Sequence, residues 1–226
     1  MKPWVELGRT KTPDGGDMRL KQRDDEYSIV VDGVELMSSR VHGSEEALAE
    51  VACEDLAGRK KPSVLVGGLG MGFTLRAALD LLPADASVTV AELVPEVAEW
   101  NRGPLGPLAG DPLADQRVHL TLADVGAVLR QSVGRFDAIL LDVDNGPAAL
   151  TSSGNSDIYG EPGVARLHRA LRPGGRLAVW SAWAERDFEH RLRRQGFQAR
   201  TVRVRARGNK GSRHVIFVGD RSRRPA

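Results

Sequence analysis

Three closely spaced glycines and a later acid form the first pattern in this sequence that could bind a ligand. The run Gly68-Leu-Gly-Met-Gly72 follows a short apolar stretch, and Glu92 lies 20 residues after Gly72, at the end of the next apolar stretch. Glycines between a strand and a helix let the backbone approach a ligand closely. A carboxylate at the tip of the following strand can accept hydrogen bonds from both ribose hydroxyls. This spacing predicts a nucleoside site.

The same turn argues against two other nucleotide sites. A dinucleotide fingerprint would need a third glycine where Phe73 stands, and no Gly-Lys-Ser/Thr follows as a P-loop requires. The remaining alternative is a tight strand-to-helix turn without a ligand.

Two further acids follow predicted strands. Asp142 ends the apolar run 138–141. Open α/β sheets bind ligands at the carboxyl ends of their strands, so we expect Asp142 in a site, with loop capping as the alternative. Asp124 follows the run 118–122. Its carboxylate could accept a hydrogen bond from the 6-amino group of adenine, or it could cap a helix over 125–131. The residues support both interpretations equally.

Strands and helices alternate from residue 63 onward, which predicts a parallel sheet covered by helices on both faces. The predicted strands are 63–66, 87–91, 118–122, 136–141 and 176–180. The predicted helices are 73–82, 94–100, 125–131 and 163–171. Two last apolar runs, 199–205 and 214–218, are joined by a polar loop and predict an antiparallel pair.

Short strands precede this alternating region, with Asp32-Gly33 as a hairpin turn. We therefore expect a small β-hairpin region over 1–43, a nucleoside-binding domain over 44–220 with Ser44 capping its first helix, and a disordered basic tail over 221–226. The early strands are 18–22, 27–31 and 34–37.

Together these motifs resemble the class I S-adenosylmethionine-dependent methyltransferase fold, and within it the spermidine/spermine synthase branch. The resemblance extends over residues 18–218. It implies a Rossmann-like, mostly parallel seven-stranded sheet with a C-terminal antiparallel hairpin and a small N-terminal β-strand appendage. The segments that carry it are Val64 to Asp80, Ala91 to Val97, Asp124 to Gly126, Asp142 to Asn145 and Leu171 to Gly175.

The resemblance also implies site residues and a cofactor, S-adenosylmethionine or its decarboxylated form. Asp142 would accept a proton from an amine acceptor or orient it, and Tyr159 would position the acceptor. The implied cofactor-binding residues are Gly68, Gly70, Met71, Gly72, Glu92, Leu93, Asp124, Val125 and Asp142. The implied substrate-binding residues are Glu46, Asp144 and Asn145.

The sequence departs from the branch where substrates bind. The branch usually has an Asp at the position of Gly70, and this Asp holds the free amine of decarboxylated S-adenosylmethionine. A neutral residue removes an anion that would repel the carboxylate of ordinary S-adenosylmethionine. A Tyr-His pair of the branch is replaced by Ser44-Glu45. We therefore expect alkylation of a small amine-containing acceptor with methyl transfer favoured, and aminopropyl transfer as the alternative.

A dispersed set of acids could form an acidic mouth for a cationic substrate, although each is more often a solvated surface acid. These acids are Glu45, Glu46, Asp144, Asp157 and Glu161. We assign Trp180 and Trp183 to core or rim packing, with a wall of the crevice as the alternative.

The charge is unevenly distributed, which raises a third interpretation. The last 36 residues contain 12 Lys and Arg and one acid, Asp220. A non-catalytic module with a vestigial nucleoside pocket could bind nucleic acid or protein through the basic hairpin Arg200 to Arg213. This partner is not favoured, because the hairpin has no aromatic side chains for base stacking.

The remaining composition excludes several classes. The chain has 226 residues, enough for one core, and no run approaches the ~20 apolar residues of a membrane span. One cysteine, Cys53, cannot form an internal disulfide, and the five histidines lack metal-ligand spacing. We therefore expect a cytoplasmic protein that binds neither metal nor membrane, and the resemblance implies a homodimer.

Overall fold

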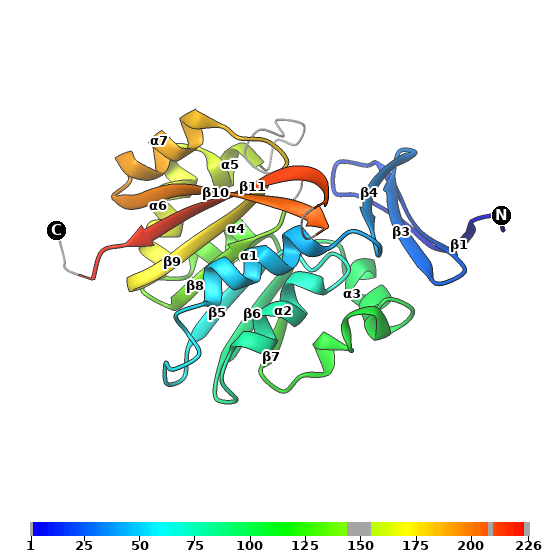
Figure 1. Ribbon diagram of the computed structural model, residues 1–226, viewed down its shortest axis with the longest axis horizontal. Helices are drawn as coiled ribbons and strands as arrows, with labels where there is room; N and C mark the ends of the chain where they lie inside the picture. Colours follow the sequence, from blue (N-terminus) through cyan, green and yellow to red (C-terminus); the bar gives the residue numbers. More distant parts are fainter. Residues whose placement is uncertain (1, 144–154, 208–209, 224–226) are drawn as a thin grey trace.

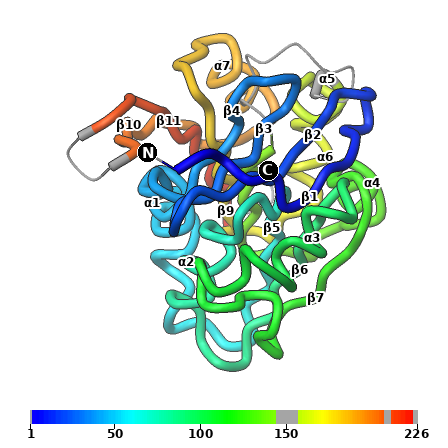
Figure 2. Tube along the Cα trace, turned by 90° about the vertical axis from the view of Figure 1, so that its right-hand side faces the viewer, coloured from blue at the N-terminus to red at the C-terminus, as the bar shows by residue number. Residues whose placement is uncertain are grey.

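Two β-sheets organise the part of the chain that the structure describes, residues 2–143, 155–207 and 210–223. In this computed structural model a four-stranded antiparallel sheet lies beside a seven-stranded sheet flanked by helices (Figure 1). Viewed from the side, the small sheet lies against the end of the larger one (Figure 2). No helix among these residues is long and apolar enough to span a bilayer.

The small sheet has the strand order β1-β2-β3-β4. Asp32 and Gly33 join β3 to β4 with φ of 49° and 84°, the left-handed conformation that a two-residue hairpin needs. Strand β1 was not predicted, because most of its side chains are exposed and its sequence shows no apolar alternation. The strands are β1 (Val5–Lys11), β2 (Asp17–Arg23), β3 (Glu26–Val31) and β4 (Val34–Ser38).

The large sheet has the order β10-β11-β9-β8-β5-β6-β7, which confirms the predicted mostly parallel sheet with an antiparallel C-terminal hairpin. Arg221, assigned to the tail by sequence, is the last residue of β11. The parallel strands are β5 (Ser63–Gly67), β6 (Ser87–Glu92), β7 (Val118–Leu122), β8 (Phe136–Leu141) and β9 (Leu171–Ser181). The hairpin strands are β10 (Phe197–Arg207) and β11 (Lys210–Arg221).

Seven α-helices and two short 3-10 helices are assigned in the described residues. The α-helices are α1 (Gly43–Cys53), α2 (Phe73–Leu81), α3 (Pro95–Arg102), α4 (Val125–Arg130), α5 (Asn155–Tyr159), α6 (Glu161–Ala170) and α7 (Arg186–Arg194). The 3-10 helices are η1 (Gly106–Ala109) and η2 (Pro112–Ala114).

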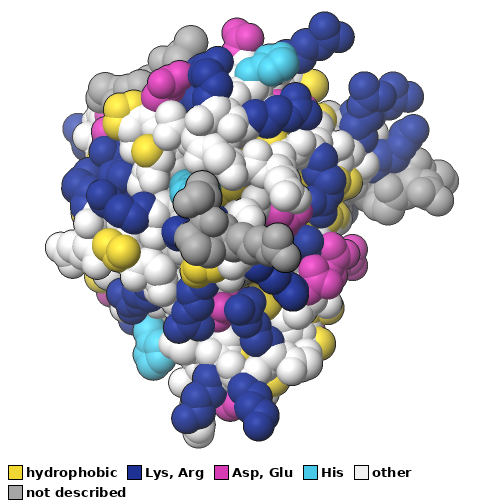
Figure 3. All heavy atoms as spheres, turned by 90° about the vertical axis from the view of Figure 1, so that its left-hand side faces the viewer, with side chains coloured by type: hydrophobic (Ala, Val, Ile, Leu, Met, Phe, Trp, Pro, Cys, Tyr) yellow, Lys and Arg dark blue, Asp and Glu magenta, His cyan; other side chains and the backbone are white. Residues whose placement is uncertain are grey.

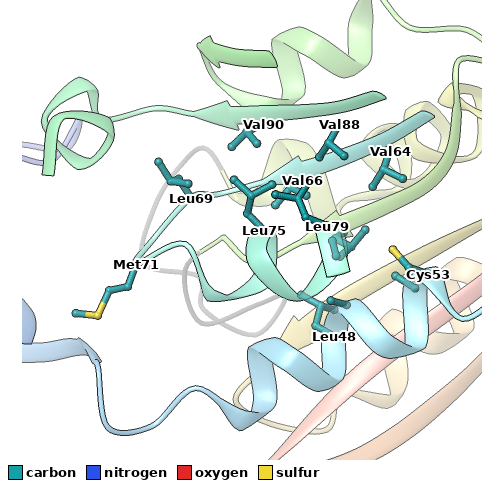
Figure 4. Close-up of a cluster of buried hydrophobic side chains, with 14 of the residues drawn as sticks. Leu48, Cys53, Val64, Val66, Leu69, Met71, Leu75, Leu79, Val88 and Val90 are labelled. Carbon is teal, nitrogen blue, oxygen red and sulfur yellow. The ribbon is translucent and has the colours of Figure 1, made fainter. Parts of the chain in front are cut away.

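The buried strands supply both faces of the core because alternate side chains point to opposite sides of the sheet. In β5, Val64 and Val66 pack into a cluster with Leu48 of α1 and Leu75 of α2 (Figure 4). Leu65, between the two valines, joins the cluster on the other face. Helices on both faces therefore fix the position of β5 and of the glycine turn that follows it.

Two local predictions were wrong. Ser44 does not cap α1: the helix already includes Gly43, and the Ser44 hydroxyl donates to Glu45 Oε2 at 2.6 Å. The strand predicted over 176–180 begins earlier: β9 starts at Leu171 and includes Arg172 to Gly175, where the register between β8 and β9 shifts. Gly174, with φ of 77°, adopts a conformation that other residues rarely accept, and such irregularities occur within strands as bulges.

Candidate active site

A cavity of about 70 Å³ lies between the glycine turn, the start of α1 and the end of β8. This is the carboxyl edge of the parallel strands, where the sequence predicted a site. The small sheet closes one side of it through β4. The lining residues are Leu36, Met37, Ser38, Glu45, Leu69, Gly70, Met71, Phe73, Thr74, Asp142 and Trp180.

The glycine turn packs directly against the chain that carries Asp142. Gly68, Gly70 and Gly72 have φ of 89°, 53° and 86°. A Cβ on Gly68 would overlap the carbonyl oxygen of Asp142, and one on Gly70 would lie 3.0 Å from Met37 Sδ. Only glycine combines these backbone angles with so close an approach. The turn thus packs closely beside Asp142, and its predicted contact with a nucleoside stays a prediction.

Glu92 holds the same turn from the other side. Its Oε2 accepts from the Leu69 amide at 2.9 Å, and its Oε1 accepts from the Val94 amide at 2.8 Å. The residue is 7% exposed. These two hydrogen bonds join the glycine turn to the start of α3 through the Glu92 carboxylate. The neighbouring Leu93 is 49% exposed and offers apolar surface. The binding of an adenosyl group by Glu92 and Leu93 stays a prediction.

Asp124 acts as the N-cap of α4. Its Oδ1 accepts from the Ala127 amide at 3.0 Å, which is the helix-capping alternative of the sequence analysis. Val125 is buried and packs against Gly67 at the end of β5. The contacts of both residues to adenine stay predictions.

Asp142 and Glu45 bring two carboxyl groups to one cavity. Thr74 Oγ1 donates to Asp142 Oδ2 at 2.8 Å. Burial and, to a smaller extent, the Glu45 charge raise the pKa of Asp142 to about 7, although the Thr74 hydrogen bond acts to lower it. Burial also raises the pKa of Glu45, while the Ser44 hydroxyl lowers it. An enclosed carboxyl with a pKa near 7 can exchange a proton at neutral pH.

The other acids of the expected acidic mouth bind elsewhere or lie outside the described residues. Glu46 is exposed and lies 2.8 Å from His42 Nδ1, Asp157 pairs with Arg130 and Arg166, and Glu161 pairs with Arg194. None of these three lines the cavity. Asp144 and Asn145 lie outside the described residues, so their substrate-binding role stays a prediction.

Tyr159 lies behind the site rather than in the cavity wall. It is 2% exposed and packs edge-on against Phe188, with ring centroids 5.6 Å apart. Its hydroxyl donates to the carbonyl of Val143 at 3.5 Å, next to Asp142. This contact supports the chain segment that carries Asp142. The predicted direct contact with an acceptor remains to be tested.

Two cavity residues were not assigned as site residues from sequence. Glu45 was one of several dispersed acids, although it stands where the resembling branch has a substrate-binding residue. Trp180 was assigned to packing, and its ring lines the cavity while lying 4.9 Å from that of His214. Among the described residues no group of His, Cys, Asp and Glu could hold a metal ion.

The strand order and the glycine turn define the class I S-adenosylmethionine-dependent methyltransferase fold. Within this class, the fold with its N-terminal antiparallel sheet is that of the spermidine synthases. The chain matches no family model and no curated protein.

Three solved structures carry this comparison, and 97% of the chain aligns with each. Spermidine synthase from Thermotoga maritima aligns with a TM-score of 0.77 at 16% identity over 74% of its length. A spermidine synthase in complex with the transition-state analogue AdoDATO gives 0.74 at 18% identity over 73% of its length. A probable spermidine synthase from Corynebacterium glutamicum ATCC 13032 gives 0.64 at 17% identity over 81% of its length.

Two substitutions should move the Asp142 pKa in opposite directions. Thr74→Val removes the hydrogen bond that stabilises the carboxylate, so the pKa should rise further. Glu45→Gln removes the neighbouring negative charge, so the pKa should fall. Carbon-13 NMR of labelled aspartate side chains, followed from pH 4 to 9, measures both. Shifts in the same direction would contradict the described contacts.

Proposed function

We propose that this protein transfers an aminopropyl group from decarboxylated S-adenosylmethionine to a small amine. The observation that carries the proposal is the placement of Glu45 and Asp142 in one cavity with Gly70. The expectation of methyl transfer rested on the loss of an acid at Gly70. Glu45 brings a carboxyl group to the same cavity from α1, so this loss is compensated. The likeness to spermidine synthases supports the same alternative.

Electrostatics then favours amines over carboxylates in this cavity. Two unit charges 4 Å apart interact by about 4 kcal/mol at an effective dielectric constant near 20. Ionised Glu45 or Asp142 would attract an ammonium group and repel the carboxylate of ordinary S-adenosylmethionine. Burial raises the pKa of both acids, and an ammonium group that enters the cavity would lower it again by stabilising their charged forms.

The chain's own residues would orient the reactants and move one proton. When bound, the sulfonium substrate supplies an electrophilic carbon whose bond to sulfur breaks as the nitrogen–carbon bond forms, with the thioether leaving. An acceptor amine attacks only without its extra proton, and Asp142, which lines the cavity, would take that proton. Thr74 holds the Asp142 carboxylate in one orientation. The narrow cavity between Met37 and Trp180 aligns the acceptor.

Calorimetric titration with S-adenosylmethionine and with its decarboxylated form tests the proposal. We expect the decarboxylated form to bind at least tenfold more tightly, and Glu45→Gln to reduce this preference. Glu46→Gln is the matched control, because Glu46 is exposed and does not line the cavity.

Three outcomes would count against the proposal. Preference for ordinary S-adenosylmethionine would indicate methyl transfer. Binding of neither compound would support the non-catalytic interpretation. An equal effect of the Glu45 and Glu46 substitutions on the binding preference would contradict the role proposed for Glu45 in the cavity.

The homodimeric state and the cytoplasmic location stay predictions.

A further inference from the structure

A basic surface lies at the amino ends of the parallel strands, whereas the cavity lies at their carboxyl ends. Figure 3 shows this face, on which Lys and Arg side chains outnumber acidic ones. We call this surface the basic edge. It consists of exposed Lys and Arg residues that lie shortly before a parallel strand or shortly after β11. Its members are Arg59, Lys60, Lys61, Arg135, Arg169 and Arg223.

Backbone contacts bring these residues together from distant parts of the sequence. The Gly134 amide donates to the carbonyl of Arg169 at 2.9 Å, and the Arg135 amide donates to the carbonyl of Ala170 at 2.8 Å. Arg135 and Arg169 therefore lie on adjacent chain segments. The Arg223 side chain packs over Gly174 in β9.

Several acids near the basic edge already pair with arginines. Asp137, whose side chain is fully buried, is shared by Arg59 at 3.2 Å and Arg172 at 2.6 Å. Arg176 pairs with three further acids at this end of the sheet, namely Glu54, Asp55 and Asp220.

Five cations of the basic edge consequently have no acidic partner within residues 2–143, 155–207 and 210–223. They are Lys60, Lys61, Arg135, Arg169 and Arg223. Uncompensated charges on one face repel each other and attract a polyanion.

We propose that the basic edge binds double-stranded nucleic acid through its phosphate backbone, without reading sequence. The strands β11, β9, β8 and β5 are neighbours, and three strand spacings of about 4.8 Å cover about 14 Å. That width corresponds to about four base-pair steps of ~3.4 Å. The basic edge contains no aromatic residue, so it offers no platform for stacking unpaired bases. This inference does not depend on the proposed transferase activity.

Fluorescence anisotropy with a labelled 20-base-pair DNA duplex, an RNA duplex and a single strand tests the proposal on the full chain. We expect both duplexes to bind more tightly than the single strand. The triple variant Lys60→Glu, Arg135→Glu and Arg169→Glu should weaken duplex binding more than tenfold.

The control variant is Arg203→Glu, Arg205→Glu and Arg213→Glu, which makes the same change in net charge on the exposed β10–β11 hairpin. It should retain most of the duplex affinity. Equal losses in both variants, or a loss confined to the hairpin variant, would overturn the assignment. Thermal unfolding of each variant establishes that the fold is intact.

The salt dependence provides an independent readout. Five phosphate contacts predict a slope near −4.5 in a plot of log K against log salt, or a loss of several hundredfold between 50 and 200 mM. An affinity that is insensitive to salt would contradict phosphate binding. Absence of duplex binding, or tighter binding to anionic phospholipid vesicles than to either duplex, would also overturn the proposal.

Discussion

Replacing Asp142 by Asn should lower kcat for aminopropyl transfer by about a hundredfold to ten-thousandfold, the range of a general acid–base group. Asn keeps the size of the side chain and can accept from Thr74, but it cannot take a proton. Binding of the decarboxylated cofactor should change much less than kcat. Steady-state kinetics and calorimetry on the same preparation separate the two effects. A variant with near-normal kcat would remove Asp142 from the proton-transfer role.

The same substitution should stabilise the folded protein at alkaline pH. The Asp142 pKa is about 7 in the folded state and near the ordinary value of 3.8 when unfolded. A raised folded pKa means that the wild type loses stability as pH rises from about 4 through 7. Asn carries no charge, so this loss is absent in the variant. Urea unfolding should give equal stabilities near pH 4 and a more stable variant at pH 8.

The second large effect is expected at Glu92. Replacement by Ala leaves the Leu69 and Val94 amides without their carboxylate partner in a buried site. Each unsatisfied buried group costs about 1–3 kcal/mol, so the free energy of unfolding should fall by about 2–6 kcal/mol. The glycine turn should also lose its shape, and binding of either cofactor form should drop below detection. Urea unfolding and calorimetry measure these two changes.

Glu92→Gln is the informative companion to the alanine variant. The Gln side chain keeps one oxygen acceptor but presents an NH₂ group to the second backbone amide. The free energy of unfolding should therefore lie between those of the wild type and Glu92→Ala. Its nucleoside affinity should fall as well, because fewer acceptor sites are left for hydroxyl groups. An alanine variant as stable as the wild type would contradict the support that Glu92 gives to the turn.

The sequence determined those parts of the fold that depend on local patterns. Apolar runs of strand length between helical segments define the parallel sheet, because burial on both faces requires continuous apolar strands. The Gly68 to Gly72 turn, Glu92 and Asp142 could be placed because each follows a predicted strand. Strand β1 could not be predicted, since an exposed edge strand has no distinctive apolar pattern.

Only the tertiary structure decided which acid shares the cavity with Asp142. Glu45 and Glu46 are adjacent in sequence, yet α1 directs Glu45 into the cavity and leaves Glu46 exposed beside His42. Neighbouring residues on a helix point in different directions, and the packing of α1 selects which one faces the site. Glu45 and Asp142 are 97 residues apart. Their electrostatic coupling depends on a distance that no local pattern encodes.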